Sequence, residues 1–251
     1  MQNITVVKVS GHEIDDAVFL SRFAETIAAI DVPLIIVHGG GREITDMQKR
    51  MGITPSYIDG LRVTDEESLT LVEMVLCGLI NTRLVRLLVS AGVDAMGLSG
   101  VDRGIIRARK MQYQEHDMGY TGSVDVVRGD ALIALLAERI IPVIAPVCLG
   151  DESTYNVNAD HVAGAVAGAV AAERVVFLTN VPGVLKGGRL LDRLTAEETD
   201  RLIADGTIFG GMIPKVRTAT AALANGARSA VITDLDGLRM GKGTVFMPAG
   251  G

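Results

Sequence analysis

The sequence predicts an α/β protein with a mainly parallel β-sheet that is covered by helices on both faces. Short, apolar, β-branched runs alternate with amphipathic stretches along most of the 251 residues. This alternation is typical of βαβ units, whose strands lie parallel and are buried on both sides. The hydrophobic fraction of 48% is sufficient for a large core. No repeat or low-complexity tract divides the sequence, so we expect one continuous sheet.

The first four elements follow the order β-α-β-α. Residues 3 to 9 form a β-branched run, and residues 14 to 30 place apolar side chains on one helical face. A second buried strand, residues 33 to 37, is followed by another helical stretch. Ligands of parallel sheets bind at the carboxyl ends of the strands, and residues 8 to 11 and 38 to 41 both fall there.

The middle of the chain is predicted to hold a long helix and a hairpin. Thr64 and Glu67 form a T-x-x-E capping box, which opens a helix that extends to about Ala91. A strand covers residues 93 to 98. Two alternating segments between residues 105 and 127 predict a β-hairpin over the sheet, where it can act as a lid.

The last 120 residues continue the alternation of helices and strands. We expect helices over residues 131 to 138 and 162 to 172, a capped helix from Thr195 and a helix after Gly210-Gly211. We expect strands over residues 141 to 147, 174 to 179, 229 to 233 and 244 to 247.

Composition and charge exclude several classes of function. A net charge of −6 and a pI near 5.3 argue against a nucleic-acid or anionic-membrane surface, and we expect a small-molecule partner. Cys77 and Cys148 lie in apolar surroundings and are predicted to be reduced core thiols. The N-terminus carries no basic-then-apolar leader, and the longest apolar run is too short to cross a bilayer, so we expect a cytoplasmic protein.

A polar stretch at residues 155 to 160 is the first candidate site. Asn156 and Asn158 alternate as on an extended segment, and Asp160 lies where a helix N-terminus favours negative charge. The stretch is equally typical of an Asx turn with a helix N-cap. The choice between the two depends on the rest of the chain.

Glycines and lysines after strands favour a phosphate site. Glycine clusters let backbone N–H groups approach phosphate oxygens, but neither a G-x-G-x-x-G fingerprint nor a Walker phosphate loop is present. Lys8 lies inside an apolar strand, where the alternatives to a functional role are an edge strand or a side chain that reaches solvent. Lys215 lies near a helix start, which is unfavourable for a cation unless an anion binds there. Cations with backbone donors suit phosphoryl transfer.

The motifs together resemble the amino acid kinase superfamily, and within it the N-acetylglutamate kinases. Six segments occur in the family's order and cover almost the whole chain: Lys8-x-x-Gly11, His38-Gly39-Gly40-Gly41, Gly60-Leu61-Arg62-Val63-Thr64, Asn156-Val157-Asn158-Ala159-Asp160, Asn180-Val181-Pro182-Gly183-Val184 and Gly211-Met212-x-x-Lys215. The resemblance implies ATP-dependent phosphorylation of the γ-carboxylate of N-acetyl-L-glutamate in arginine biosynthesis. The Mg²⁺ is carried by the nucleotide, and no metal-ligating residue is expected.

The resemblance also implies roles for individual residues. The expected catalytic residues are the transition-state lysines and the carboxylate that orients them, namely Lys8, Lys215 and Asp160. The expected substrate-binding residues are Gly40, Gly41, Arg62, Asn156 and Asn158, with Arg62 as a bidentate partner of the α-carboxylate. The expected nucleotide-binding residues are Gly11, Asn180, Val181, Gly183, Val184, Leu185, Thr207, Ile208 and Phe209.

The implied architecture is a three-layer αβα sandwich with an open sheet of about eight strands and two lobes. Residues 1–172 would bind the acyl-amino acid and mediate dimerisation, and residues 173–251 would bind ATP. In this family, arginine-inhibited hexamers carry an extra N-terminal helix, whereas only Met1 and Gln2 precede the first predicted strand here. The expectation is therefore a homodimer that arginine does not inhibit.

Two departures and two alternatives accompany the resemblance. Ser10 replaces a glycine that is usual in the family, and its hydroxyl could add a phosphate donor, while the segment between Asp234 and Gly243 is shorter than usual. One alternative is the related kinase of carrier-protein-linked aminoadipate in lysine biosynthesis, for which the basic hairpin could serve as a docking surface rather than a solvated face. The other is a non-catalytic nucleotide sensor of the same fold.

Overall fold

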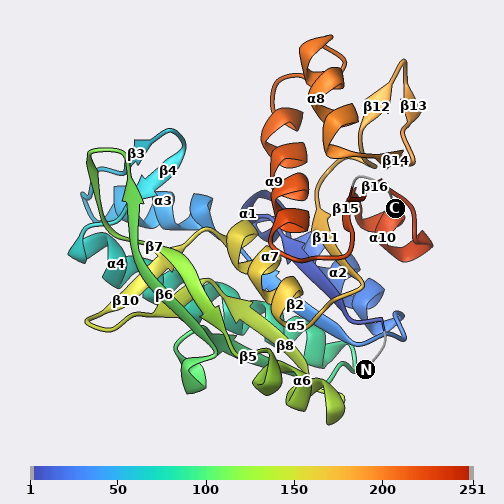
Figure 1. The fold of residues 1–251 in the computed structure, drawn as a ribbon. Coiled ribbons are helices and arrows are strands. Elements are labelled where there is room, and N and C mark those ends of the chain that lie inside the picture. Colours follow the sequence, from blue (N-terminus) through green and yellow to red (C-terminus); the bar gives the residue numbers. More distant parts are fainter. Residues whose placement is uncertain (1–2, 249–251) are drawn as a thin grey trace.

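The computed structural model describes residues 3–248 as a three-layer αβα sandwich built on an eight-stranded sheet (Figure 1). The strand order is β14-β16-β15-β11-β1-β2-β8-β5, and the six strands from β15 to β5 run parallel. The bounds are Thr5–Val9 (β1), Leu34–His38 (β2), Ala95–Ser99 (β5), Ile141–Ala145 (β8), Arg174–Leu178 (β11), Arg193–Leu194 (β14), Ala230–Thr233 (β15) and Thr244–Phe246 (β16). The predicted fold class is confirmed. Met1 and Gln2 lie outside the described residues.

Helices cover both faces of the sheet because its strands send alternate side chains into two cores. In β1, Val6 packs in one core, and Val7 and Val9 pack in the other. The first core is covered by Gly129–Ala137 (α6), Ala159–Ala169 (α7), Ala196–Ala204 (α8) and Met212–Ala224 (α9). The second is covered by Ala17–Ala28 (α2), Gly41–Arg50 (α3), Glu66–Glu73 (α4), Asn81–Ser90 (α5) and Leu235–Met240 (α10).

The predicted helix over residues 14 to 30 is wrong at its start. A short helix, Gly11–Ile14 (α1), ends before α2 begins. The carboxylate of Asp16 accepts hydrogen bonds from the N–H groups of Val18 and Phe19 at 2.8 and 3.2 Å. This cap starts a new helix and turns the chain between the two.

The predicted capping box of Thr64 and Glu67 is also wrong. Asp65 caps α4, with its carboxylate accepting the N–H of Ser68 at 2.8 Å. Thr64 is instead buried, and its hydroxyl oxygen lies 3.0 Å from that of Thr121 on the hairpin. Both residue types can cap a helix, and burial of the threonine under the hairpin leaves the cap to its neighbour.

The long helix that was expected to reach Ala91 contains a π-helix. Residues Met74–Ile80 adopt this wider turn between α4 and α5. π-Helical segments are rare and are frequent at functional sites. Here the segment places Leu76 and Ile80 against Gly40: a Cβ built on that glycine would lie 2.2 Å from Ile80 Cδ1 and 2.8 Å from Leu76 Cδ2.

The predicted hairpin is confirmed as Ile106–Tyr113 (β6) and His116–Val127 (β7). It joins two short strands that were not predicted, Val147–Leu149 (β9) and Thr154–Val157 (β10), in a small closed barrel. Other elements that were not predicted are the hairpin Ser56–Ile58 (β3) and Leu61–Val63 (β4), the hairpin Leu185–Lys186 (β12) and Arg189–Leu190 (β13), and the 3₁₀ turn Asp102–Gly104. None of the helices in residues 3–248 is long and apolar enough to span a membrane.

Candidate active site

Two glycine turns meet at the carboxyl ends of β1 and β2. The N–H of Gly39 donates to the carbonyl of Val9 at 3.1 Å, which joins the second turn to the first strand. A Cβ added to Gly11 would lie 3.2 Å from the backbone nitrogen of Gly41, so the two turns need glycine to approach this closely. Backbone N–H groups in such turns are suited to binding an anion.

Lys8 leaves β1 beside these turns and pairs with Asp160. Its Nζ lies 2.8 Å from Asp160 Oδ1, and the exposed fractions of the two side chains are 13% and 26%. The strand is central in the sheet, between β11 and β2, so the alternative of an edge strand for Lys8 is excluded. Asp160 lies in the first turn of α7, where the helix dipole stabilises its negative charge.

Lys215 approaches the same place from the first turn of α9. Its Nζ lies 3.5 Å from Asn180 Oδ1, and Asp160 forms no ion pair with it. Burial lowers the pKa of Lys215, and nearby Lys8 lowers it further, while Glu13 acts in the opposite direction. Lys8, Asp160 and Lys215 border one cavity of about 100 Å³, so the structure brings the three predicted catalytic residues together.

Arg62 extends from β4 and is held by neutral acceptors. It donates to the carbonyl of Gly41 at 2.9 Å and to Thr45 Oγ1 at 2.8 Å, and it also donates to Gln48 Oε1. Its guanidinium carbon lies 4.8 Å above the centre of the Tyr57 ring. Within residues 3–248 no carboxylate forms an ion pair with Arg62, so its charge remains available to an anionic ligand.

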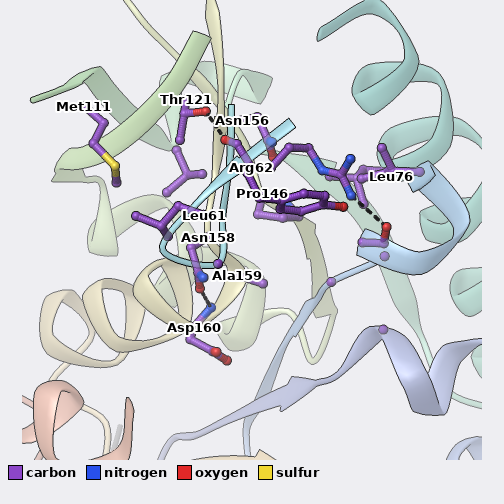
Figure 2. Close-up of a pocket in the computed structure, with 18 of the residues that line it drawn as sticks. Leu61, Arg62, Leu76, Met111, Thr121, Pro146, Asn156, Asn158, Ala159 and Asp160 are labelled. Atoms are coloured by element: carbon purple, nitrogen blue, oxygen red, sulfur yellow. Dashed lines mark hydrogen bonds between the residues drawn. The ribbon is translucent and has the colours of Figure 1, made fainter. Parts of the chain in front are cut away.

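Asn156 and Asn158 line a second cavity, which Lys8 and Asp160 also border, and they reach it from β10 and from the N-cap of α7 (Figure 2). Asn156 Nδ2 donates to Thr64 Oγ1 at 3.1 Å, and Asn158 Oδ1 accepts the N–H of Asp160 at 2.8 Å. The two readings of the polar stretch are therefore compatible, because Asn158 is a helix cap that also lines the cavity. The cavity, of about 260 Å³, is lined by these predicted residues: Lys8, Gly11, Gly40, Gly41, Arg62, Asn156, Asn158 and Asp160.

A comparison with protein families identifies the group to which this arrangement belongs. Residues 3–234 match the model of the amino acid kinase family. The chain belongs to the amino acid kinase family. Similar proteins include the acetylglutamate kinase of a Roseiflexus species, 52% identical over 96% of this chain and 92% of that protein, and the acetylglutamate kinase of Chloroflexus aurantiacus, 50% identical over 98% and 97%. A crystal structure of a Streptococcus mutans protein, 31% identical, covers 98% of this chain and 99% of its own with a TM-score of 0.79.

The predicted nucleotide-binding residues of this amino acid kinase lie apart from the 260 Å³ cavity, with the exception of Gly11. Asn180 and its neighbours follow β11. Gly183 has a positive φ of 144°, and a Cβ there would lie 2.6 Å from Thr244 Oγ1, so both the backbone conformation and the packing favour glycine. Val184 and Ile208 are buried in the core, and their N–H groups donate to Thr244 Oγ1 and to the carbonyl of Leu202, both at 2.8 Å. Phe209, by contrast, is 74% exposed. The remaining predicted residues are Val181, Leu185 and Thr207.

Other residues of the amino acid kinase site were not predicted. Gln48, Tyr57 and Thr121 support Arg62 or its strand, and their residue types carry no signal in the sequence. The hydroxyl of Ser10 donates to the carbonyl of Leu178 at 3.0 Å and accepts from Lys8 Nζ at 3.4 Å, so it braces the turn. Cys77 and Cys148 are free thiols, and burial raises their pKa values to about 11 and about 12.

His38 fixes the second glycine turn from below. It is fully buried, and burial lowers its pKa to about 4. The neutral ring contacts the carbonyl of Gly39 through Nδ1 at 2.9 Å and the amide of Asn81 through Nε2 at 3.0 Å. Since Asn81 follows the π-helix, the turn and the helix are joined by hydrogen bonds as well as by packing.

Proposed function

We propose that the protein transfers the γ-phosphoryl group of ATP to the γ-carboxylate of N-acetyl-L-glutamate. The observation that carries the proposal is that Arg62 and the Lys8–Asp160 pair border one small cavity beside the glycine turns. Arg62 is hydrogen-bonded by neutral acceptors and therefore keeps its net positive charge. A dicarboxylate needs a cation at each end of such a cavity. The relatives at 52% and 50% identity carry the name acetylglutamate kinase.

The substrate would lie along the cavity from Arg62 to Lys8. The guanidinium would bind the α-carboxylate, and Asn156 and Asn158 would bind the acetamido group. The backbone N–H groups of Gly40 and Gly41 would face the reacting carboxylate. This placement would put the γ-carboxylate next to the two lysines, which would bind the phosphate oxygens of ATP.

The reaction requires positioning and charge neutralisation rather than a covalent enzyme intermediate. A γ-carboxylate oxygen of the substrate attacks the γ-phosphorus of ATP, the bond from that phosphorus to the β–γ bridging oxygen breaks, and ADP leaves with the electron pair. Lys8 and Lys215 neutralise the charge on the transferring group, and Asp160 holds Lys8 in place. Mg²⁺ bound to the triphosphate oxygens adds charge neutralisation when the nucleotide is present.

The same proposal includes the organisation of the whole protein. Residues 1–172 would hold the acyl-amino acid and the dimer interface, and residues 173–251 would hold ATP, in a cytoplasmic homodimer. Support for an interface comes from exposed apolar side chains on the π-helix, on α5 and on the edge strand β5, namely Met74, Leu79, Val89 and Met96. A monomer rarely leaves such residues gathered on neighbouring elements.

An ADP-release assay tests this function. N-acetylglutamate, glutamate, N-acetylaspartate and aminoadipate are compared at equal concentration with ATP and Mg²⁺. We expect release with N-acetylglutamate far above the other three, together with a hydroxylamine-trapped acyl phosphate. Equal release with glutamate, or release with aminoadipate alone, overturns the substrate assignment, and no release with any of them overturns the kinase.

A further inference from the structure

Glu13 is a buried carboxylate that has no task in the reaction described above. It lies in α1, two residues after Gly11, and only 9% of it is exposed. Its Oε2 atom is buried and has no hydrogen-bond partner among the side chains that the structure describes. A buried carboxylate oxygen without a donor destabilises the fold, so its presence calls for a compensating role.

The other carboxylates near Glu13 all have partners. A cavity of about 330 Å³ is lined by Glu13, Asp16, Asp234 and Asp236 together with Thr179 and Asn180. Asp16 caps α2, Asp234 accepts the N–H of Gly237 at 2.7 Å, and Asp236 pairs with Arg22 at 2.7 Å. These three acids therefore serve the local structure, and Glu13 does not share that explanation.

Asn180 connects the cavity that Glu13 lines with the second lysine. Its side chain lines the Glu13 cavity, and its Oδ1 lies 3.5 Å from Lys215 Nζ. Lys8 has a carboxylate at 2.8 Å, whereas no carboxylate in the described part of the chain forms an ion pair with Lys215. The two cations of the site are thus held in different ways.

The charged groups around Lys215 show which carboxylate can stabilise its positive charge. Lys8 and Asp160 border a cavity with Lys215, and Glu13 acts on it from α1; burial together with Lys8 lowers the pKa of Lys215, while Glu13 acts in the opposite direction. The carboxylate of Asp160 is already taken by Lys8. Glu13 is therefore the negative charge left to hold a proton on the Lys215 amine.

We propose that Glu13 is a positioning residue for Lys215, whose ammonium group it keeps charged and aligned across the Asn180 side chain. The inference rests on the proposed phosphoryl transfer. With the Asn180 amide in between, the Glu13 carboxylate stays away from the phosphate oxygens. If Glu13 paired directly with Lys215, its negative charge would repel those oxygens. Because Glu13 does not pair directly with Lys215, its Oε2 atom is left without a hydrogen-bond donor.

The kinetic test compares Glu13→Gln, Glu13→Asp and a matched control, Asp236→Asn, which removes a paired carboxylate from the same cavity. For Glu13→Gln we expect kcat to fall about tenfold or more, with both KM values within about twofold. The alkaline limb of its kcat–pH profile should move down by about one pH unit. Glu13→Asp should recover part of kcat, and Asp236→Asn should resemble the unmodified protein.

Thermal unfolding separates positioning from a structural role. Because Oε2 has no partner to lose, Glu13→Gln should leave Tm unchanged or raise it while kcat falls. A lowered Tm with an unchanged alkaline limb would make Glu13 a structural residue and overturn the inference.

A measurement that does not depend on turnover completes the test. After reductive ¹³C-methylation, the Lys215 signal is assigned by its loss in Lys215→Arg and is titrated in the unmodified protein and in Glu13→Gln. We expect the Lys215 pKa to be lower in the variant. An equal pKa in both would refute the role of Glu13 even in an active kinase, whereas an inactive protein with a shifted pKa would refute the proposed function alone.

Discussion

At the scale of single residues, Arg62 and Lys8 show two ways of keeping a cation in a cavity. Lys8 has a carboxylate at 2.8 Å, which fixes its position and offsets much of its charge. Arg62 is fixed by carbonyl, hydroxyl and amide oxygens, which satisfy its donors but leave its net charge in place. Burial lowers the pKa of Arg62, and Tyr57 opposes this effect. We therefore expect Arg62 to contribute to binding and Lys8 to contribute to the reaction.

Replacement of Arg62 by lysine tests the first of these roles. A lysine cannot reproduce the planar fork that spans Gly41, Thr45 and Gln48 and still faces a carboxylate. We expect Arg62→Lys to raise KM for the acylated amino acid about tenfold or more, with KM for ATP nearly unchanged. Arg22→Lys at the surface is the control. An equal rise in both KM values would contradict a place for Arg62 in the amino-acid pocket.

Replacement of Lys8 by alanine tests the second. Loss of one donor to the transferring group typically lowers kcat about a hundred- to a thousandfold. We expect Lys8→Ala to do this with little change in either KM, as measured by steady-state ADP release. Near-normal turnover would remove Lys8 from the catalytic residues.

Asp160→Asn keeps the shape of the side chain and removes its charge. The Lys8 contact at 2.8 Å would then lose its ion pair and keep only a hydrogen bond from the ammonium group to a neutral amide oxygen, so the lysine would be less firmly held. We expect kcat to fall about a hundredfold while Tm changes little. A change in Tm alone would show that Asp160 serves only the first turn of α7.

The residues that could be predicted are those that break a local pattern. Lys8 interrupts an apolar strand, and Asp160 closes a polar stretch before a small-residue helix, so each is conspicuous without coordinates. Gln48 and Thr121 belong to ordinary amphipathic segments, and only the folded chain brings them to Arg62 and its strand. Glu13 escaped notice because a glutamate near a helix start is normally a favourable surface charge.

At the scale of elements, the N-terminus of α4 shows how burial decides between two adequate caps. Asp65 and Thr64 are neighbours, and either side chain can accept a backbone N–H. The Thr64 hydroxyl contacts Thr121 on the hairpin instead, so it does not cap α4. Helices and the hairpin were predictable from their periodicity, but this choice and the two- to four-residue strands β9, β10 and β12 to β14 depend on contacts between distant segments.

The cap has a measurable contribution to stability. We expect Asp65→Ala to lower the unfolding free energy by about 1 kcal/mol, while Glu67→Ala stays within about 0.5 kcal/mol of the unmodified protein. Chemical denaturation of the three proteins checks this. The reverse order would restore the capping box that the sequence suggested.

The same cap predicts a dependence on pH. The side-chain and backbone hydrogen bonds of Ser68 lower the pKa of Asp65 below its ordinary value of 3.8. A carboxyl whose folded pKa is below its unfolded pKa stabilises the fold above the unfolded value and loses that contribution as pH falls through the folded one. The difference in stability between the unmodified protein and Asp65→Ala should therefore be full at pH 6 and shrink below about pH 4.

At the scale of the whole molecule, alternation of strands and helices was enough to predict the layers and the place of the site. The reversed strand β16 and the closed barrel were not, because both depend on which strands pair rather than on which segments are strands. The exposed apolar side chains of the π-helix, of α5 and of β5 also could not be predicted to form one surface, because only the fold brings these elements together.

These side chains predict the state of association. We expect sedimentation equilibrium to give twice the chain mass of 26.5 kDa. Leu79→Glu should shift the equilibrium towards the monomer, because it buries a charge in the interface. Val18→Glu is the control, since Val18 is 70% exposed on α2, which is not one of the three elements that carry these side chains. A monomeric unmodified protein, or a hexamer, would contradict the proposed dimer.

The number of residues in the π-helix between α4 and α5 sets how the residues after it are rotated about the helix axis. Successive residues of an α-helix are about 100° apart around the axis, so one residue more or fewer there would rotate everything downstream by that angle. Leu76 and Ile80 would leave Gly40, and Asn81 would leave His38. Homologous chains that keep this glycine turn should therefore vary in sequence along residues 74 to 81 far more freely than in length.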